Sequence, residues 1–294
     1  MNRRDFLRRG AAAVVVSGTG LVGYTIGVEP HWLEIVARDL PIIGLPRDLD
    51  GKTLAQVSDL HVGPRVSDDY IMHSLDRLSR LTPDVVVVTG DFLTYRAERG
   101  DAQYAQLASV LAHLPRGRLA TVGVLGNHDY GRQWRDQAVA ARVVAAAEHA
   151  GVRVLRNGVH TVNGLDLIGV DDLWSGGADT RMALAARQSA AAIALCHNPD
   201  GLDQLPWPDY HGWVLAGHTH GGQCKPPFLP PPLLPVQNHR YISGEVRVDA
   251  TRTLYISRGV GYLIRARFNV RPEITVFTLR RRDGASSPSI TQGD

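Results

Sequence analysis

The chain has 294 residues, 44% of them hydrophobic, which is enough to bury one large core, and this length allows one or two domains. Its formal net charge is +3, but the first ten residues hold four arginines against one aspartate, so the remainder is about neutral. Because no basic stripe interleaved with aromatic residues appears in that remainder, we expect no nucleic-acid partner. Two cysteines, Cys196 and Cys224, exclude a disulfide framework, although a single bond between them stays open if the protein is exported.

The N-terminus has the features of an export signal. Asn2-Arg3-Arg4-Asp5-Phe6-Leu7 is typical of segments that the twin-arginine export machinery reads, and residues 11–28 are uncharged. That run is at the short end for a membrane span of about 20 residues, and no small-x-small cleavage site follows, so an uncleaved anchor and a cleaved signal are both open. We expect an anchor within residues 1–30, a folded domain over residues 31–282 and a disordered tail over residues 283–294. The protein would then be anchored to, or associated with, the extracytoplasmic side of a membrane.

Apolar runs and turn residues predict strands that alternate with helices. Strands are expected at residues 33–43, 53–57, 84–89, 119–125, 152–155, 160–162, 165–170, 191–196, 213–216, 241–248, 254–257 and 273–279. Helices are expected at residues 67–81, 101–114, 133–150 and 180–188. The first two strands would pair, Asn157-Gly158 and Asn163-Gly164 would form hairpins, and the final third would be antiparallel. This order predicts an α/β architecture built on mixed sheets.

Polar donors directly follow five of these strands. The five endings are Asp59-Leu60-His61, Gly90-Asp91, Gly126-Asn127-His128-Asp129, Cys196-His197-Asn198 and Gly217-His218-Thr219-His220. Each one alone reads as an ordinary turn, but sites in α/β sheets gather beyond the carboxyl ends of the strands. Five such endings in one chain therefore indicate a shared site. Histidines such as His160 and His211, which lie outside these endings, are interpreted as structural.

A pair of divalent metal ions would explain this choice of donors. Two such ions polarise the oxygens of a phosphate ester and lower the pKa of a coordinated water, which allows in-line attack of hydroxide on phosphorus. Imidazole, amide and carboxylate donors suit manganese, iron or zinc better than calcium. We expect manganese, with iron or zinc as the alternatives.

In their order and wording the motifs resemble the calcineurin-like metallophosphoesterase family over about residues 54–279. The resemblance rests on SDLH (58–61), GNHDY (126–130), CHNPD (196–200), GHTHGGQ (217–223) and RPEIT (271–275). Within the family the chain is most similar to the branch of membrane-associated bacterial phosphodiesterases of the YkuE type. The resemblance implies a four-layer α-β-β-α sandwich of two mixed sheets flanked by helices.

The family's motifs also imply a role for each donor. The ligands would be Asp59, His61 and His220 for the first metal, Asn127, His197 and His218 for the second, and Asp91 for both. His128 lies next to a ligand in the sequence and would protonate the leaving oxygen or stabilise charge there. Asp129 would orient the imidazole of His128 and favour its protonated form.

Residues outside the motifs are candidates for binding the substrate. Arg258 and Arg265, together with Arg267, could hold a second phosphate, although surface charge is the simpler interpretation. Asp171-Asp172 is interpreted as a turn or cap, with a substrate role left open. The proline-rich stretch 225–235 must be extended. It forms either a stiff cover over the core or an apolar lip beside the site that meets a membrane or an acyl chain.

These features predict a phosphodiesterase or pyrophosphatase that acts on a lipid-linked or nucleotide-linked substrate at the outer face of the cytoplasmic membrane. The alternatives are a phosphomonoesterase or a nuclease with the same site, and a non-catalytic scaffold of the same fold. The near-neutral body disfavours a nuclease, because duplex binding depends on many phosphate contacts. A scaffold is disfavoured because the chain keeps every expected ligand. A metalloprotease is disfavoured because the chain has no HExxH motif.

Overall fold

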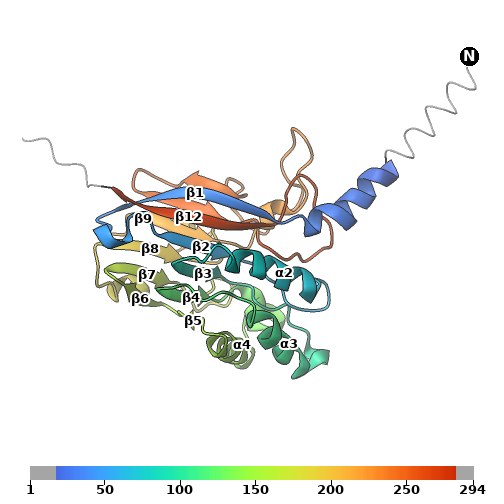
Figure 1. Cartoon of the computed structure of the whole chain (residues 1–294), viewed down its shortest axis with the longest axis horizontal. Coiled ribbons are helices and arrows are strands. Elements are labelled where there is room, and N and C mark those ends of the chain that lie inside the picture. Colours follow the sequence, from blue (N-terminus) through green and yellow to red (C-terminus); the bar gives the residue numbers. More distant parts are fainter. Residues whose placement is uncertain (1–17, 283–294) are drawn as a thin grey trace, which may run out of the picture.

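The computed structural model describes residues 18–282, and these residues form two six-stranded sheets that face each other (Figure 1). The first sheet has the order β1-β12-β2-β3-β4-β5, with β1 at Glu34–Ile43, β2 at Thr53–Val57, β3 at Val85–Thr89, β4 at Ala120–Val124, β5 at Arg153–Val154 and β12 at Glu273–Arg282. The second has the order β10-β11-β9-β8-β7-β6, with β6 at Gly158–Val162, β7 at Leu165–Gly169, β8 at Ala191–Leu195, β9 at Gly212–Ala216, β10 at Gly244–Arg247 and β11 at Arg252–Ile256.

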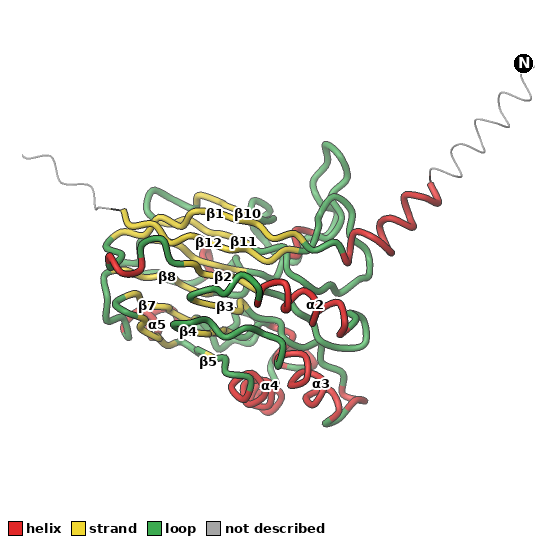
Figure 2. Tube along the Cα trace, in the orientation of Figure 1, coloured by secondary structure: helices red, strands yellow, loops and turns green. Residues whose placement is uncertain are grey.

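Helices cover the outer face of each sheet (Figure 2). The helices on the first sheet are α2 (Asp68–Ser79), α3 (Ala102–Leu111) and α4 (Gln137–His149). The shorter helices on the second sheet are α5 (Thr180–Ala185) and α6 (Gly201–Gln204). The predicted four-layer α-β-β-α sandwich is therefore confirmed.

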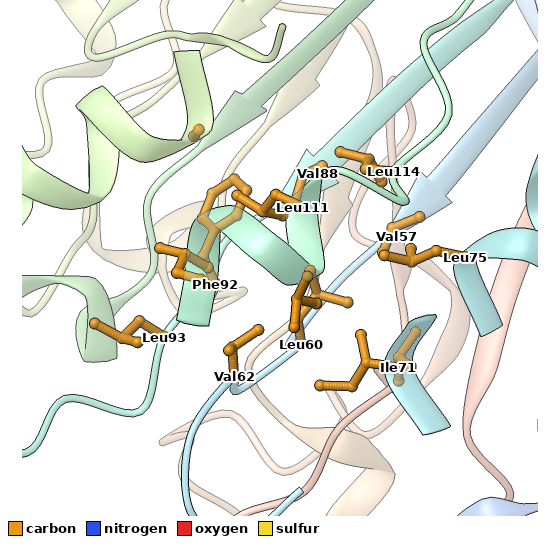
Figure 3. Close-up of a cluster of buried hydrophobic side chains, with 14 of the residues drawn as sticks. Val57, Leu60, Val62, Ile71, Leu75, Val88, Phe92, Leu93, Leu111 and Leu114 are labelled. Atoms are coloured by element: carbon orange, nitrogen blue, oxygen red, sulfur yellow. The ribbon is translucent and has the colours of Figure 1, made fainter. Parts of the chain in front are cut away.

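Strand β3 shows why the central strands have continuous apolar sequences. Side chains alternate along a strand, and both faces of β3 are covered. Val86 and Val88 pack in the cluster under the helices, part of which Figure 3 shows, whereas Val85 and Val87 pack between the sheets. Burying each such side chain contributes about 1.5–3 kcal/mol. The two packed faces hold the carboxyl end of β3, where a predicted ligand follows, in a fixed position.

Several predicted pairings are wrong. Strands β1 and β2 do not pair, because β12 lies between them, parallel to β1 and antiparallel to β2. The turn Asn163-Gly164 does join the antiparallel strands β6 and β7, but Asn157-Gly158 joins β5 in the first sheet to β6 in the second. The final third is mixed, since β11 is antiparallel to β10 and parallel to β9. The sequence of a turn does not determine which sheet the next strand joins.

Helix α4 begins four residues later than predicted. Its first turn is capped by the carboxylate of Asp136, which accepts hydrogen bonds from the amides of Ala138 and Val139 at 2.9 and 3.2 Å. The preceding residues Gln133 and Trp134 have φ of 64° and 60°, so they belong to a separate loop. This loop lies close to the candidate site described below.

The start of the described chain packs against the domain. Glu29 is buried and accepts a hydrogen bond from the amide of Val270 at 2.5 Å, and the carbonyl of Thr25 accepts one from the amide of Arg267 at 3.0 Å. Within residues 18–282, none of the helices combines the length and apolar character that a membrane crossing requires. The twin-arginine motif and the predicted disordered tail, residues 283–294, lie outside the described residues. Cys196 and Cys224 are both free.

Candidate metal centre

The five strand endings converge at one edge of the sandwich. Strands β2, β3 and β4 run parallel in the first sheet, and β8 and β9 run parallel in the second, so their carboxyl ends meet. The seven expected ligands follow these strands and are all buried: Asp59, His61, Asp91, Asn127, His197, His218 and His220. Six of them fall into two groups whose donor atoms lie within 4.8 Å of one another, and Asn127 follows β4 at the same edge.

The backbone at these positions is strained. Asp59, His61, Asp91, His218 and His220 all have positive φ, between 50° and 72°, a region that residues other than glycine seldom adopt. Such strain persists only where the surrounding structure holds it, and it is common at functional sites.

Glycine allows the close approach of the two loops from different sheets. A Cβ atom on Gly217 would lie 2.0 Å from Oγ of Ser58 and 2.4 Å from Oδ2 of Asp59. No side chain fits there, because those distances are shorter than any real carbon contact. Gly217 thus lets the loop after β9 lie directly on the loop after β2.

One group of donors consists of Asp59, His61 and His220. The Nε2 atoms of His61 and His220 are 3.0 Å apart, and Nε2 of His220 lies 3.4 Å from Oδ1 of Asp59. Asp59 and His61 follow β2 and His220 follows β9, and the donor atoms of all three lie within 4.8 Å of one another. The group can surround a single cation.

A second group shares Asp91 with the first. Oδ2 of Asp91 lies 3.3 Å from Nε2 of His197 and 3.4 Å from Nε2 of His61, so this carboxylate stands between the two groups. Nδ1 of His218 lies 3.3 Å from Nε2 of His197. Oδ1 of Asn127 is buried and has no hydrogen-bond partner among the described residues. A buried amide oxygen that has no hydrogen-bond partner is suited to bind a cation.

Hydrogen bonds on the far side of each ring fix its orientation. Nδ1 of His61 lies 3.1 Å from Oγ1 of Thr94, Nδ1 of His197 lies 2.6 Å from the carbonyl of Thr89, and Nε2 of His218 lies 2.9 Å from the carbonyl of Pro235. Each contact leaves the other ring nitrogen facing the site. Partners of this kind are typical of metal-binding histidines.

Burial and the charges of neighbouring donors shift the pKa values in the site. Burial lowers the pKa of the His61 and His218 imidazoles to about 3, which keeps them in the neutral form that binds metals. Burial alone would raise the pKa of Asp91, but the charge of His197 holds it well below its usual range, so Asp91 stays ionised. Burial and the nearby charge of Asp91 raise the pKa of Asp59 to about 7, although the charge of His197 offsets part of this rise.

His128 lies at the edge of the cluster. Its ring is in edge contact with the ring of His61, with centroids 5.0 Å apart, and its amide donates to Oδ1 of Asp91 at 2.9 Å. Unlike the ligands, the side chain is only partly buried and also lines an open cleft. His128 therefore borders both the metal ligands and the space open to a substrate.

The role expected for Asp129 is not supported by its contacts. Its carboxylate accepts hydrogen bonds from the amides of Leu93 and Gly126, at 3.0 and 2.9 Å, and within residues 18–282 it forms none with the ring of His128. The cause is the short 3₁₀ turn η5 (Asn127–Tyr130), which directs this side chain back to the amide before the turn. Asp129 shapes the loop that carries Asn127 and His128.

The arginine candidates differ in environment. Arg258 forms ion pairs with Glu34 and Glu273, so its charge is already neutralised and it does not fit the expected role of binding a phosphate. Arg265 is exposed. Arg267 is fully buried rather than a surface charge, and its Nη2 donates to the carbonyls of Arg258 and Gly261 at 2.8 and 2.7 Å.

Two further residues support the site in a way that the sequence did not indicate. Nη2 of Arg267 lies 3.5 Å from Nδ1 of His220, behind the ring of a candidate ligand, and Thr94 supports His61. Both positions depend on tertiary packing, so neither could be identified from a motif. Asp171 is a structural residue, since it accepts hydrogen bonds from the hydroxyl of Tyr130 and from Arg156.

The sandwich fold and its strand-end cluster of carboxylate, amide and imidazole donors define a metal-dependent hydrolase. The model of the calcineurin-like phosphoesterase family matches residues 52–222, and the chain belongs to this family.

The chain has relatives along nearly its whole length. It is 31% identical to the uncharacterized metallophosphoesterase YkuE of Bacillus subtilis, over 95% of this chain and 98% of that protein. It is 28% identical to phosphodiesterase YaeI of Escherichia coli, over 95% of this chain and 99% of that protein. It is 25% identical to UDP-2,3-diacylglucosamine pyrophosphatase LpxG of Chlamydia trachomatis, over 84% of this chain and 89% of that protein. The protein is a phosphoric ester hydrolase whose clustered donors fit divalent metal ions.

Proposed function

We propose that the protein is a dinuclear-metal phosphodiesterase or pyrophosphatase that acts on a lipid-linked or nucleotide-linked substrate at the outer face of the cytoplasmic membrane. The observation that carries the proposal is an exposed apolar loop whose last residue forms a hydrogen bond with His218, a candidate metal ligand. Within the proline-rich stretch 225–235, Phe228 is fully exposed and Leu229 and Leu233 are largely exposed. At the end of this stretch the carbonyl of Pro235 bonds to Nε2 of His218. This contact supports the interpretation of the stretch as an apolar lip beside the site.

The metal ions and the residues of the chain would have different roles in catalysis. When bound, manganese, iron or zinc ions would neutralise the phosphate and lower the pKa of a coordinated water. Asp91 stands where it would contribute to both ions. His128 stands between the ligands and the open cleft, so its protonated ring would donate to the leaving oxygen. Gly126 and Asp129 hold the turn that positions His128.

Further exposed apolar side chains support a membrane-facing substrate. The helix that begins the described chain (blue in Figure 1) exposes about half of each of four apolar side chains: Leu21, Val22, Ile26 and Val28. One segment contacts both this helix and the proline-rich stretch, because the amide of Arg267 bonds to Thr25 and the carbonyl of Phe268 accepts from Lys225 at 2.8 Å. The two apolar elements therefore flank the same segment. Export through the twin-arginine machinery would place this surface against the outer leaflet.

The diesterase activity is tested with two chromogenic substrates. With manganese present, we expect faster hydrolysis of bis-p-nitrophenyl phosphate than of p-nitrophenyl phosphate, measured as kcat/KM. A diester places a single negative charge at the metal centre. A strong preference for the monoester would identify a phosphomonoesterase instead. Hydrolysis of duplex DNA at a comparable rate would favour the nuclease.

The membrane surface is tested by binding of the full chain to vesicles of phosphatidylglycerol and phosphatidylethanolamine. Replacing Phe228, Leu229 and Leu233 together by serine should lower the partition coefficient about tenfold or more, since inserting each side chain contributes up to about 1.5–3 kcal/mol. Met182→Ser, at a similarly exposed methionine on α5, is the matched control and should bind like the wild type. Equal binding of the triple variant and the wild type would contradict the role of the loop.

A further inference from the structure

A cleft of about 1150 Å³ opens beside His128, and its lining is rich in positive charge. Four arginines line it, Arg65, Arg96, Arg132 and Arg135, and no aspartate or glutamate does. We call this space the arginine cleft. The four arginines come from the loops after β2, β3 and β4, which also carry candidate metal ligands, so this side of the cleft and the metal centre are built on the same strand ends.

The four arginines have no carboxylate partners. Within residues 18–282 none of them forms an ion pair, in contrast to Arg258, which has two. The guanidinium of Arg65 donates to the carbonyl of Leu263, a neutral partner. Surface arginines without partners are common singly, but four around one cleft with no opposing charge create a strong positive potential. The cleft is therefore suited to an anion.

Two tryptophans line the cleft, and one of them contacts a candidate metal ligand. The rings of Trp134 and Trp174 are 4.6 Å apart, and the ring of Trp174 contacts His218 edge-on at 4.6 Å. Trp134 follows Gln133, and both have positive φ. This strained loop holds Trp134 over the cleft, with its ring 6.5 Å from that of His128. A group attached to the anion would meet a flat apolar surface.

We propose that the arginine cleft binds a second phosphate of the substrate, next to the phosphate that is cleaved, so that the preferred substrate is a pyrophosphate diester. A simple diester carries one negative charge, and that charge lies at the metal centre. A simple diester therefore has no second charge that the four arginines could bind. A pyrophosphate diester places its second charge on the far side of His128, where the guanidinium groups can bind its oxygens in pairs. This inference rests on the proposed function and narrows it.

The reaction places new charge where the arginines lie. An oxygen of water forms a bond to one phosphorus, and the bond from that phosphorus to the bridging oxygen breaks. The bridging oxygen leaves with the electron pair as part of the second phosphate, so two monophosphates form, and the two protons of water pass to the product oxygens or to solvent. The charge on the departing phosphate grows as the bond breaks. The arginines therefore stabilise the transition state more than the bound substrate.

The test compares two substrates with the same end groups, the octyl ester of adenosine 5′-diphosphate and the octyl ester of adenosine 5′-monophosphate. Wild-type enzyme with manganese should have the higher kcat/KM for the diphosphate. In the double variant Arg132→Gln/Arg135→Gln the ratio of the two kcat/KM values should fall by about 10- to 100-fold, since bonds to charged groups are strong. The same result is expected for Arg65→Gln/Arg96→Gln. Arg181→Gln, on α5, is the matched control and should leave both rates unchanged.

The outcomes separate this inference from the proposed function. If the double variants lose activity equally on both substrates, or if the wild type prefers the monophosphate ester, the cleft does not select a second phosphate. Hydrolysis of the monophosphate ester would in either case leave the diesterase activity standing. If the wild type hydrolyses neither ester, the proposed function fails and this inference fails with it. Far-ultraviolet circular dichroism of each variant confirms that its fold is intact.

Discussion

Replacing His128 by alanine should lower kcat by about 10² to 10⁴ while both metal ions stay bound, because general acid catalysis contributes a factor of this size. The ring borders the open cleft and is only partly buried, unlike the fully enclosed ligands. Its contact with the ligand groups is an edge contact to His61. The measurement is kcat for bis-p-nitrophenyl phosphate together with the metal content of the purified variant, determined by elemental analysis.

The matched control for this variant is His160→Ala. His160 lies on β6, away from the strand ends that carry the ligands, and its loss should leave both turnover and metal content unchanged. Loss of one metal equivalent from His128→Ala would contradict the assignment. The donor atoms of His61, Asp91 and His128 all lie within 4.8 Å of one another, so this outcome is a real alternative. His128 would then be a ligand and not the proton donor.

The ligand positions could be predicted because each one is tied to the end of a strand. Asp91 follows the valine run of β3 and Asn127 follows β4, so a local pattern determines both the strand and the residue beyond it. The continuous apolar sequence of these strands also indicates that both of their faces are covered. Parallel strands then bring their carboxyl ends together, which is why separate motifs could be assigned to one site.

Pairings between distant segments could not be predicted in this way. Strand β12 inserts between β1 and β2, although more than 200 residues separate it from either strand, and no turn residue records that contact. Arg267 has the sequence context of a surface charge, yet four backbone carbonyls accept its hydrogen bonds in the interior. Its burial depends on where the segment 258–270 lies in the finished fold.

The arginine cleft was missed for a related reason. The pattern at residues 133–150 predicted a continuous helix, which would have spread Arg135 and its neighbours over a solvated surface. Instead, the cap at Asp136 starts the helix four residues later than predicted, and the loop before it brings Arg132, Trp134 and Arg135 to the site. A cap one turn inside a predicted helix is a local signal with a large effect on the site.

Asp91→Asn should abolish metal-dependent activity, because Asp91 is the one carboxylate that stands between both donor groups. Even outer hydrogen-bonding partners of metal ligands cost about 10- to 100-fold in affinity or activity, and a shared ligand should cost more. The amide has nearly the same shape but lacks the negative charge that offsets two cations. The fold should therefore survive while metal affinity is lost.

Thermal unfolding provides a readout of this loss that does not depend on turnover. After dialysis against a chelator, adding manganese at about 100 times its Kd should stabilise the wild type by about 2.7 kcal/mol, seen as a rise in Tm. Asp91→Asn should show little or no rise. Asp84→Asn is a matched control, since Asp84 is a buried carboxylate at the opposite end of β3, bonded to Thr53 and Arg118. It should lower Tm yet keep the full response to manganese. A normal manganese response in Asp91→Asn would show that the cations are held without the shared carboxylate, and the dinuclear arrangement would have to be given up.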